Sequence, residues 1–235
     1  MAVKRNQSLL RALRTIDAIS EQQPIGVSAL AQLLGDDRSA MQRTVLTLSD
    51  AGWIRLAPGT PKKWELTPHL FSIANLARSG DALRRKARTV LNRLCEETGE
   101  TAFLAIPDHQ RLVVVDVVES KHMLRMAPRI GVPVTPDRSS AGRAVLAFLD
   151  DEQRAEMLGR PPSAEELQDY AETRRRGFAM SIEEVMKGSA NAAAPILDSK
   201  GIAVAAIGIS GPTDRLNEAK LMQIGQTVRK LADLI

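Results

Sequence analysis

The residues best suited to chemistry lie in the stretch DDRSAMQRTVLTLSDAGWIRL, residues 36–56. Within it Met41, Val45 and Leu48 recur at the spacing of a helix, so we expect them to form its buried side. Arginine can bond guanine and glutamine can bond adenine through paired hydrogen bonds, so both suit the reading of base edges in the major groove of DNA. The polar residues near the start of this helix therefore predict a DNA-reading face of Arg38, Ser39, Gln42 and Arg43, with Thr44 placed to reach a phosphate.

Simpler interpretations exist for several neighbouring residues. Asp36 and Asp37 are better explained as caps of the helix, because carboxylates accept hydrogen bonds from its free N–H groups. An alternative for Arg43 is a surface ion pair with Asp50 or a neighbouring residue. Trp53 is expected in the core of the domain, the alternative being a wedge against DNA.

The elements that must position this face are three helices and a hairpin. Residues 53–67 alternate apolar and polar side chains around a Pro-Gly-Thr-Pro turn, which predicts two strands. With the helices before them, these strands indicate a winged helix-turn-helix domain over residues 1–68, in which Lys62 and Lys63 would contact phosphates or the minor groove from the wing. The alternative is a small helical domain whose polar face is only solvated. The three helices are predicted over residues 8–20, 27–35 and 38–50.

Length and charge support a two-domain protein with a basic N-terminal part. The chain has 235 residues, more than most single domains, and is 44% hydrophobic and 26% charged, as expected of a chain that folds. Residues 1–80 contain ten Lys and Arg against six Asp and Glu, whereas residues 81–235 contain 22 of each. The whole excess of +4 thus lies in the first third, where it would attract a phosphate backbone.

The remainder of the chain predicts a second domain of the α+β class. After a mostly helical stretch over 68–99, apolar runs of strand length alternate with helical patterns and with turns rich in proline and glycine. The predicted strands are 102–107, 111–120, 122–127, 191–198 and 202–212, and the predicted helices are 140–158, 163–177 and 218–235.

A second candidate site lies at the start of one of these helices, in SSAGRAVLAFL. Small side chains let a ligand approach the backbone, and the free N–H groups of a first helical turn can bind an anion. We therefore expect Ser139, Ser140 and Ala141 to hold a carboxylate or similar polar group of a small molecule. The alternative is that these small residues only permit close packing of the helix on a sheet.

Eight stretches, in this order, resemble the IclR family of bacterial transcriptional regulators over nearly the whole chain. They are SLLRALRTIDAIS, the helix-turn-helix, ETGETAFLAI, VVVDVVES leading to RIG, SSAGRAVLAFL, RRRGFAMSIEEVMKG, AAAPILDSKG and VAAIGISGP. The resemblance implies a winged helix-turn-helix over 1–68, a helical linker over 69–90 and a GAF-like effector-binding domain over 91–235. It also implies double-stranded operator DNA and a small-molecule effector as partners, a homodimer or homotetramer, and a repressor.

The resemblance also implies residues for the effector site. It places Ser181, Asn191, Gly208 and Ser210 opposite the helix start, with Met126 as an apolar lining residue. This sequence departs from the family pattern at Gln42, where relatives tend to have histidine, and at LTPHLF, where the wing lacks a usual glycine. Asn191 stands where relatives carry cysteine, and the region after AEML is shorter than usual.

Other functional classes are disfavoured by what the sequence contains. Cys95 is the only cysteine, so no intrachain disulfide or cysteine metal cluster forms, and its helical setting predicts a buried structural thiol. His69, His109 and His122 lie in separate segments, and GISGP does not match a nucleophile elbow, so we expect no enzyme, metal or cofactor. No signal peptide or membrane span is predicted, which favours the cytoplasm. The alternative function is a sensor of small molecules or a partner-binding protein that does not bind DNA.

Overall fold

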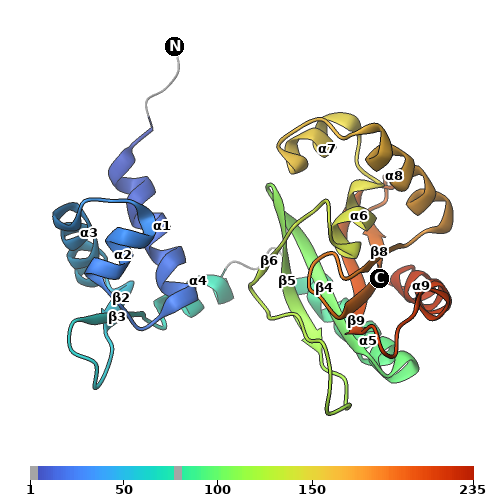
Figure 1. Cartoon of the computed structure of the whole chain (residues 1–235), viewed down its shortest axis with the longest axis horizontal. Coiled ribbons are helices and arrows are strands. Elements are labelled where there is room, and N and C mark those ends of the chain that lie inside the picture. Colours follow the sequence, from blue (N-terminus) through green and yellow to red (C-terminus); the bar gives the residue numbers. More distant parts are fainter. Residues whose placement is uncertain (1–4, 77–80) are drawn as a thin grey trace. The chain divides into compact units, whose positions relative to one another are not determined.

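The computed structural model describes residues 5–76 and 81–235, and the chain divides into two compact units, Met1–Ser79 and Gly80–Ile235 (Figure 1). No helix in the described ranges is both long and apolar enough to cross a membrane.

The predicted linker over 69–90 is two helices that belong to different units. Helix α4 (His69–Leu76) groups with the first unit and helix α5 (Asp81–Thr98) with the second. Ala87 and Val90 on α5 are buried in the core of the second unit. The predicted end of the linker at residue 90 therefore falls in the middle of α5, and the second unit begins before it. Residues 77–80 of the predicted linker lie outside the described residues.

The first unit has the element order of the predicted winged helix-turn-helix. Ile19, Leu30 and Met41, one from each of its first three helices, are fully buried against one another and against Trp64 of a small antiparallel sheet. Trp53 packs half-buried against the same core, edge-on to His69, as a core residue would. In chain order before α4 the elements are α1 (Gln7–Gln22), β1 (Ile25–Gly26), α2 (Val27–Leu34), α3 (Arg38–Asp50), β2 (Ile54–Leu56) and β3 (Lys63–Leu66), with β3 central in the sheet.

The turn between α2 and α3 follows from its sequence. Gly35 ends α2 in the left-handed conformation at φ 66°, which glycine adopts without steric cost. Asp37 then caps α3, so only two residues separate the turn glycine from the next helix. This short connection holds α2 and α3 in the arrangement that a helix-turn-helix requires.

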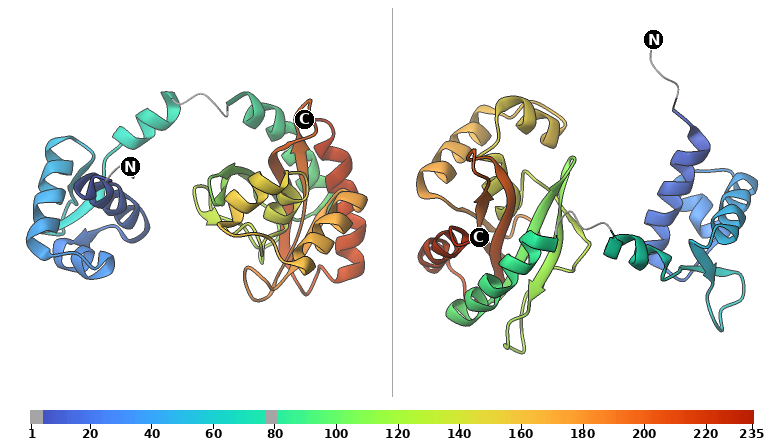
Figure 2. Two further views of the ribbon diagram at one scale, coloured as in Figure 1. Left: turned by 90° about the horizontal axis from the view of Figure 1, so that it is seen from above. Right: turned by 180° about the vertical axis from the view of Figure 1, so that it is seen from behind.

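The second unit is built on a six-stranded antiparallel sheet. Its order is β6-β5-β4-β9-β8-β7, so the hairpin of β4 and β5 and the hairpin of β8 and β9 meet in the centre through β4 and β9 (Figure 2). The predicted α+β fold class is confirmed. The strands are β4 (Thr101–Asp108), β5 (Arg111–Val118), β6 (Pro133–Val134), β7 (Ala179–Ile182), β8 (Ser189–Leu197) and β9 (Ala203–Pro212).

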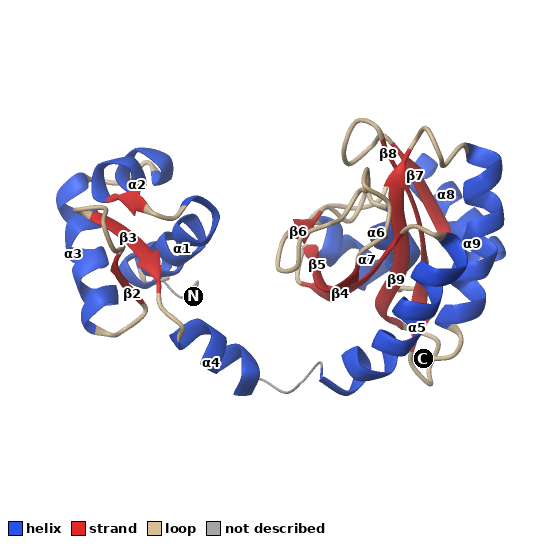
Figure 3. Cartoon of the chain, turned by 90° about the horizontal axis from the view of Figure 1, so that it is seen from below, coloured by secondary structure: helices blue, strands red, loops and turns tan. Residues whose placement is uncertain are grey.

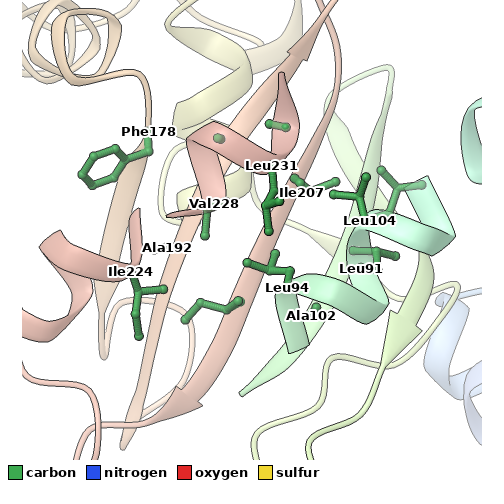
Figure 4. Packing of buried hydrophobic residues seen from close by; sticks show 14 of the residues in the cluster. Leu91, Leu94, Ala102, Leu104, Phe178, Ala192, Ile207, Ile224, Val228 and Leu231 are labelled. Atoms are coloured by element: carbon green, nitrogen blue, oxygen red, sulfur yellow. The ribbon is translucent and has the colours of Figure 1, made fainter. Parts of the chain in front are cut away.

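Helices cover both faces of this sheet (Figure 3). Helix α5 and the terminal helix α9 (Glu218–Ala232) pack on one face, where Leu91 and Leu94 meet Ile207 and Val228 (Figure 4). The other face carries α6, which packs on β8 and β9 and contacts α8. The predicted helix over 140–158 is two helices, and the helices on this side are α6 (Ser140–Leu146), α7 (Asp151–Leu158) and α8 (Ala164–Arg176).

Several strands differ from the predictions, and the two-residue strands β1 and β6 were not predicted. The apolar run 122–127, predicted as a strand, is irregular, and the outer edge of β5 pairs with Pro133–Val134 instead. Strand β7 was not predicted, because its four residues follow Gly177 directly and are too few to show an alternating pattern.

Candidate DNA-reading helix and effector cavity

Helix α3 has one buried side and one exposed side. The buried side consists of Ala40, Met41, Val45 and Leu48, which is the helical spacing expected from the sequence. The structure thus brings four of the predicted reading residues together on a single exposed face. The exposed residues of this helix include Arg38, Ser39, Gln42, Arg43, Leu46 and Thr47.

The start of α3 is fixed by two aspartates with different roles. Asp37 accepts hydrogen bonds from the backbone N–H groups of Ser39 (2.9 Å) and Ala40 (3.0 Å). It also accepts one from the Ser39 hydroxyl at 2.6 Å, and this bond is the main cause that lowers the pKa of Asp37 below its ordinary value. Asp36 was expected as a cap too, but it pairs with Arg11 of α1 at 2.9 Å and so braces α3 against α1.

The reading candidates differ in how free their side chains are. Within the described ranges, the side chains of Gln42 and Arg43 have no hydrogen bond or ion pair, so the alternative pairing of Arg43 with Asp50 is not formed. Thr44 is half-buried and its hydroxyl donates to the carbonyl of Ala40 at 3.0 Å, which turns it away from the exposed face. Gln42 and Arg43 are therefore the side chains best able to meet a base edge.

The wing offers two free ammonium groups. Lys62 and Lys63 are exposed, and neither side chain has an ion-pair partner in the part of the chain that the structure describes. Lys62 lies at φ 66°, a conformation that residues with a Cβ atom rarely adopt. Arg55 on the neighbouring strand is paired across the sheet with Glu65 at 2.8 Å, so its charge is already balanced. The wing's uncompensated positive charge is therefore concentrated at its tip.

The second unit contains a cavity of about 360 Å³ on the α6 face of the sheet. Its lining includes seven of the eight predicted effector residues, which come from five separate segments of the chain. Those seven are Met126, Ser139, Ser140, Ala141, Ser181, Asn191 and Ser210.

The start of α6 forms one wall of this cavity. The Ser139 hydroxyl donates to the carbonyl of Thr135 (2.7 Å) and accepts from the N–H of Gly142 (3.0 Å), so it serves as the helix cap. The N–H groups of Ser140 and Ala141 occupy the first two helical positions, which have no acceptor within a helix. Close packing also requires small residues here, since a Cβ on Gly142 would collide with the carbonyl oxygen of Pro136.

The opposite wall is a row of polar residues across three neighbouring strands. Ser181, Asn191 and Ser210 are cross-strand partners on β7, β8 and β9. The Asn191 amide donates a long hydrogen bond of 3.4 Å to the Ser181 hydroxyl. Among the described residues, the hydroxyls of Ser140 and Ser210 have no protein partner although both residues are buried. These two hydroxyls are thus available to a polar group of a ligand.

Gly208, the eighth predicted residue, is not in the cavity lining. It is the cross-strand partner of Phe103, and a Cβ at this position would lie 2.8 Å from Cζ of the Phe103 ring. The Phe103 side chain lines the cavity in its place. Gly208 therefore provides the space in which that ring lies, and does not itself reach the cavity.

Sequence reasoning missed the lining residues that come from irregular segments. Arg125 and Arg129 precede β6, and Val185 and Met186 lie between β7 and β8. Irregular segments show no periodic signal, so the only pointer was the pair of arginines on either side of the predicted Met126.

Comparison with known domain families gives two matches that together span most of the chain. Residues 8–58 match the family described as IclR helix-turn-helix domain. Residues 77–235 match the family described as bacterial transcriptional regulator IclR C-terminal.

Relatives and solved structures agree with these matches. The chain is 31% identical to the transcriptional repressor IclR of Escherichia coli, over 96% of this chain and 87% of that protein. It is 30% identical to the acetate operon repressor of Salmonella typhimurium, with the same coverage of 96% and 87%. The fold is similar, with a TM-score of 0.78 and 20% identity, to an IclR homolog of Microbacterium hydrocarbonoxydans complexed with 4-hydroxybenzoate, over 97% of both chains.

Proposed function

The chain belongs to the IclR family of bacterial transcriptional regulators, and from that premise we propose that it is an effector-controlled repressor. The relatives are named as regulators and repressors, so the chain is a DNA-binding regulator and not an enzyme. The single observation that carries the proposal is the exposed face of α3, on which Gln42 and Arg43 are free of protein partners.

We assign base reading to α3 and phosphate contact to the wing. Gln42 would bond adenine and Arg43 guanine, with Arg38 and Ser39 at the helix start beside them. Lys62 and Lys63 would neutralise phosphates, which adds affinity without sequence preference. Thr44 has a lesser role in this proposal because its hydroxyl already bonds within the helix.

We assign effector binding to the cavity of the second unit. Its mixture of apolar side chains with a few convergent hydroxyl and N–H groups is typical of small-molecule sites. The likeness to a homolog complexed with 4-hydroxybenzoate supports a small-molecule ligand for this chain, although the identity of that ligand belongs to that protein. Ser140, Ser181 and Ser210 would bond the polar group of the effector and Met126 would cover its apolar part.

We further propose that the chain works as a homodimer or a higher oligomer. The N-terminal half of α1 exposes Leu9 by 59% and Leu13 by 52%, and α4 exposes Phe71 by 71% and Leu76 by 81%. Apolar side chains of this size at helical spacing favour a protein contact over water. A second copy fits, since two recognition helices then read two half-sites. The proposed location is the cytoplasm, where a bacterial operator lies.

Binding to DNA tests the proposal. Purified full-length protein would be titrated by fluorescence anisotropy against a duplex from the intergenic region upstream of its own coding sequence, and against a scrambled duplex, over a series of salt concentrations. Tight binding to the first duplex that weakens steeply with salt is the expected result.

Equal weak binding to both duplexes would contradict an operator at that site. The wild-type protein and an Arg43→Ala variant would then each be tested for binding to a library of all intergenic sequences of the genome. If the library also yields no selected sequence, the helix face is only solvated, and the alternative of a sensor without DNA binding would replace this proposal.

A further inference from the structure

Helix α5 is where the chain enters the second unit, and its two halves are held to the sheet in different ways. In the second half, Leu91 and Leu94 are buried in the core of the unit (Figure 4). Over residues 82–89 Ala87 is the one buried side chain and Leu83 is half-buried, while the others are exposed. The first half of α5 therefore has little apolar surface with which to bind the sheet.

A buried aspartate supplies the attachment that apolar packing does not. Asp116 on β5 is only 3% exposed. Its carboxylate accepts a hydrogen bond from Nη1 of Arg88 at 2.6 Å and lies 3.6 Å from Nε of Arg84. Arg88 also donates to the carbonyl of Val117 at 3.1 Å. Both arginines belong to the first half of α5, so charge and hydrogen bonds fasten this half to β5.

The burial of Asp116 makes this attachment costly to break. An ion pair at the surface contributes little, whereas a buried carboxylate that loses its cation keeps an uncompensated charge. Asp116 also accepts from the N–H of Val117 at 2.9 Å, but this neutral group does not balance its charge. If the first half of α5 left the sheet, Asp116 would lose the cations that balance it. We therefore expect this half of the helix to stay on β5.

A bulge in β5 places the carboxylate of Asp116 directly behind the proposed effector cavity. Asp116 is the cross-strand partner of Leu104. Val114 is the partner of the next residue, Ala105, so Val115 is an extra residue in β5. Residues two apart in a regular strand point to the same face of the sheet. Here Val114 lines the cavity on one face, whereas Asp116 meets α5 on the other. The cavity wall and the attachment of α5 thus lie within three residues.

We infer that Asp116 is a positioning residue for operator binding, because it holds the first half of α5 and so fixes the connection to the winged helix-turn-helix. The inference rests on the proposed binding of an operator by a dimer and deepens it. Two recognition helices read two half-sites only at a matching separation. A connection that moves freely loses more conformational entropy on binding than a fixed one. Non-specific duplex requires no such separation, since its affinity comes from phosphates.

The test measures operator preference and stability in matched variants of the full-length protein. A duplex would first be enriched from genomic fragments by the wild type, and binding to it and to a scrambled duplex would be measured by fluorescence anisotropy. The variants are Asp116→Asn, Arg88→Gln and Arg88→Lys, with urea unfolding of each in parallel. Arg93→Gln is the control, because Arg93 is similarly exposed on α5 but pairs with Glu97 of the same helix at 2.6 Å.

We expect Asp116→Asn and Arg88→Gln to lower the preference for the enriched duplex over the scrambled one by about 5- to 150-fold, the usual range for coupled sites. Arg88→Lys should keep most of the preference, since an ammonium group can still pair with Asp116, and Arg93→Gln should keep all of it.

The outcomes separate a positioning role from a purely structural one. Variants that unfold at lower urea but keep the full preference would overturn the inference, and so would an equal loss in Arg93→Gln. If Asp116→Asn does not fold, Arg88→Gln decides the question, because its side chain is half exposed. If the wild type enriches no duplex, the proposed function fails, and this inference fails with it.

Discussion

At the scale of single residues, the proposed DNA interface would separate side chains that read bases from side chains that only add affinity. Gln42 projects from the exposed face of α3 with no protein partner. We predict that Gln42→Ala loses about 1–3 kcal/mol of discrimination at one base pair, because the paired hydrogen bonds to adenine disappear. Anisotropy titrations with the operator and its single-base variants measure this loss.

Lys62 and Lys63 provide the matched comparison at the wing. Changing either lysine to alanine should weaken binding to every duplex alike, because one phosphate contact is lost. The slope of the logarithm of the binding constant against the logarithm of the salt concentration should become less steep by about one. A Gln42→Ala variant with this same uniform behaviour would show that Gln42 does not read bases.

Gly208 shows which part of the site the sequence could not predict. The helix start was predictable from its small and polar residues, whereas the polar row was implied only by the resemblance to the family. The position of the Phe103 ring was not, because only the pairing of β4 with β9 places it over Gly208. Cross-strand neighbours are distant in sequence, so no local pattern contains this contact.

We therefore predict that Gly208→Ala disturbs both stability and the cavity. A Cβ would lie 2.5 Å from the carbonyl oxygen of Ala192 and 2.8 Å from the Phe103 ring, so the ring must move. The expected loss is about 1–3 kcal/mol in the free energy of unfolding, together with weaker ligand binding. Urea denaturation and calorimetry measure these two effects. Gly26→Ala is the control, since its Cβ would meet only an ordinary contact at 3.7 Å, and an equal loss in both variants would contradict the steric explanation.

At the scale of elements, the helices of the first unit were predicted well, whereas the single helix predicted over 140–158 is two helices and irregular segments were predicted poorly. Helix α3 begins and ends at the predicted residues because its buried positions and its cap are both local signals. The run 122–127 is apolar enough for a strand, yet a strand also needs a partner, and the edge of β5 is taken by β6. Side chains bond the main chain of this run instead, and one example is the hydrogen bond that Arg215 donates to the carbonyl of Leu124.

The start of α8 gives a prediction for acid stability. Glu166 completes the capping box with Ser163 and binds Arg160, and the Arg160 hydrogen bond is the main cause that lowers the pKa of Glu166 from 4.5 to about 2. A carboxyl with a lowered pKa in the folded state stabilises it above its ordinary pKa and loses that effect as the pH falls. The stabilisation from Glu166 is thus complete above pH 4.5 and disappears between about pH 4.5 and 2.

Glu166→Gln should therefore reduce stability at neutral pH and have a flatter acid dependence than the wild type. Thermal unfolding over a pH series measures the difference, which should shrink as the pH falls. Glu165→Gln is the control, because this exposed neighbour has no ion pair within the described residues. A difference between wild type and Glu166→Gln that stays constant down to pH 2 would contradict the role of the Arg160 pair.

At the scale of the whole molecule, we expect operator binding to depend on the proposed self-association. We predict that the double change Leu9→Gln and Leu13→Gln lowers the dimer fraction and weakens operator binding, because a single recognition helix reads only one half-site. Sedimentation and anisotropy at matched concentrations measure the two effects. Leu167→Gln is the control, as this leucine is similarly exposed at 43% but lies on α8. Dimers that persist in the double variant would place the interface elsewhere.

In the proposed homodimer, control by an effector requires a coupling free energy between ligand binding in the cavity and operator binding by α3. If a carboxylate in the cavity weakens operator binding by some factor, the operator must weaken binding of that carboxylate by the same factor, since both describe one coupling free energy. Such couplings are typically about 1–3 kcal/mol, or about 5- to 150-fold. We predict that calorimetry of a carboxylate that binds the cavity, with the protein saturated by operator duplex, gives this reciprocal change, whereas scrambled duplex gives none. An affinity for the acid that is equal with and without operator would mean that the cavity does not control the recognition helix, even if both sites bind their ligands.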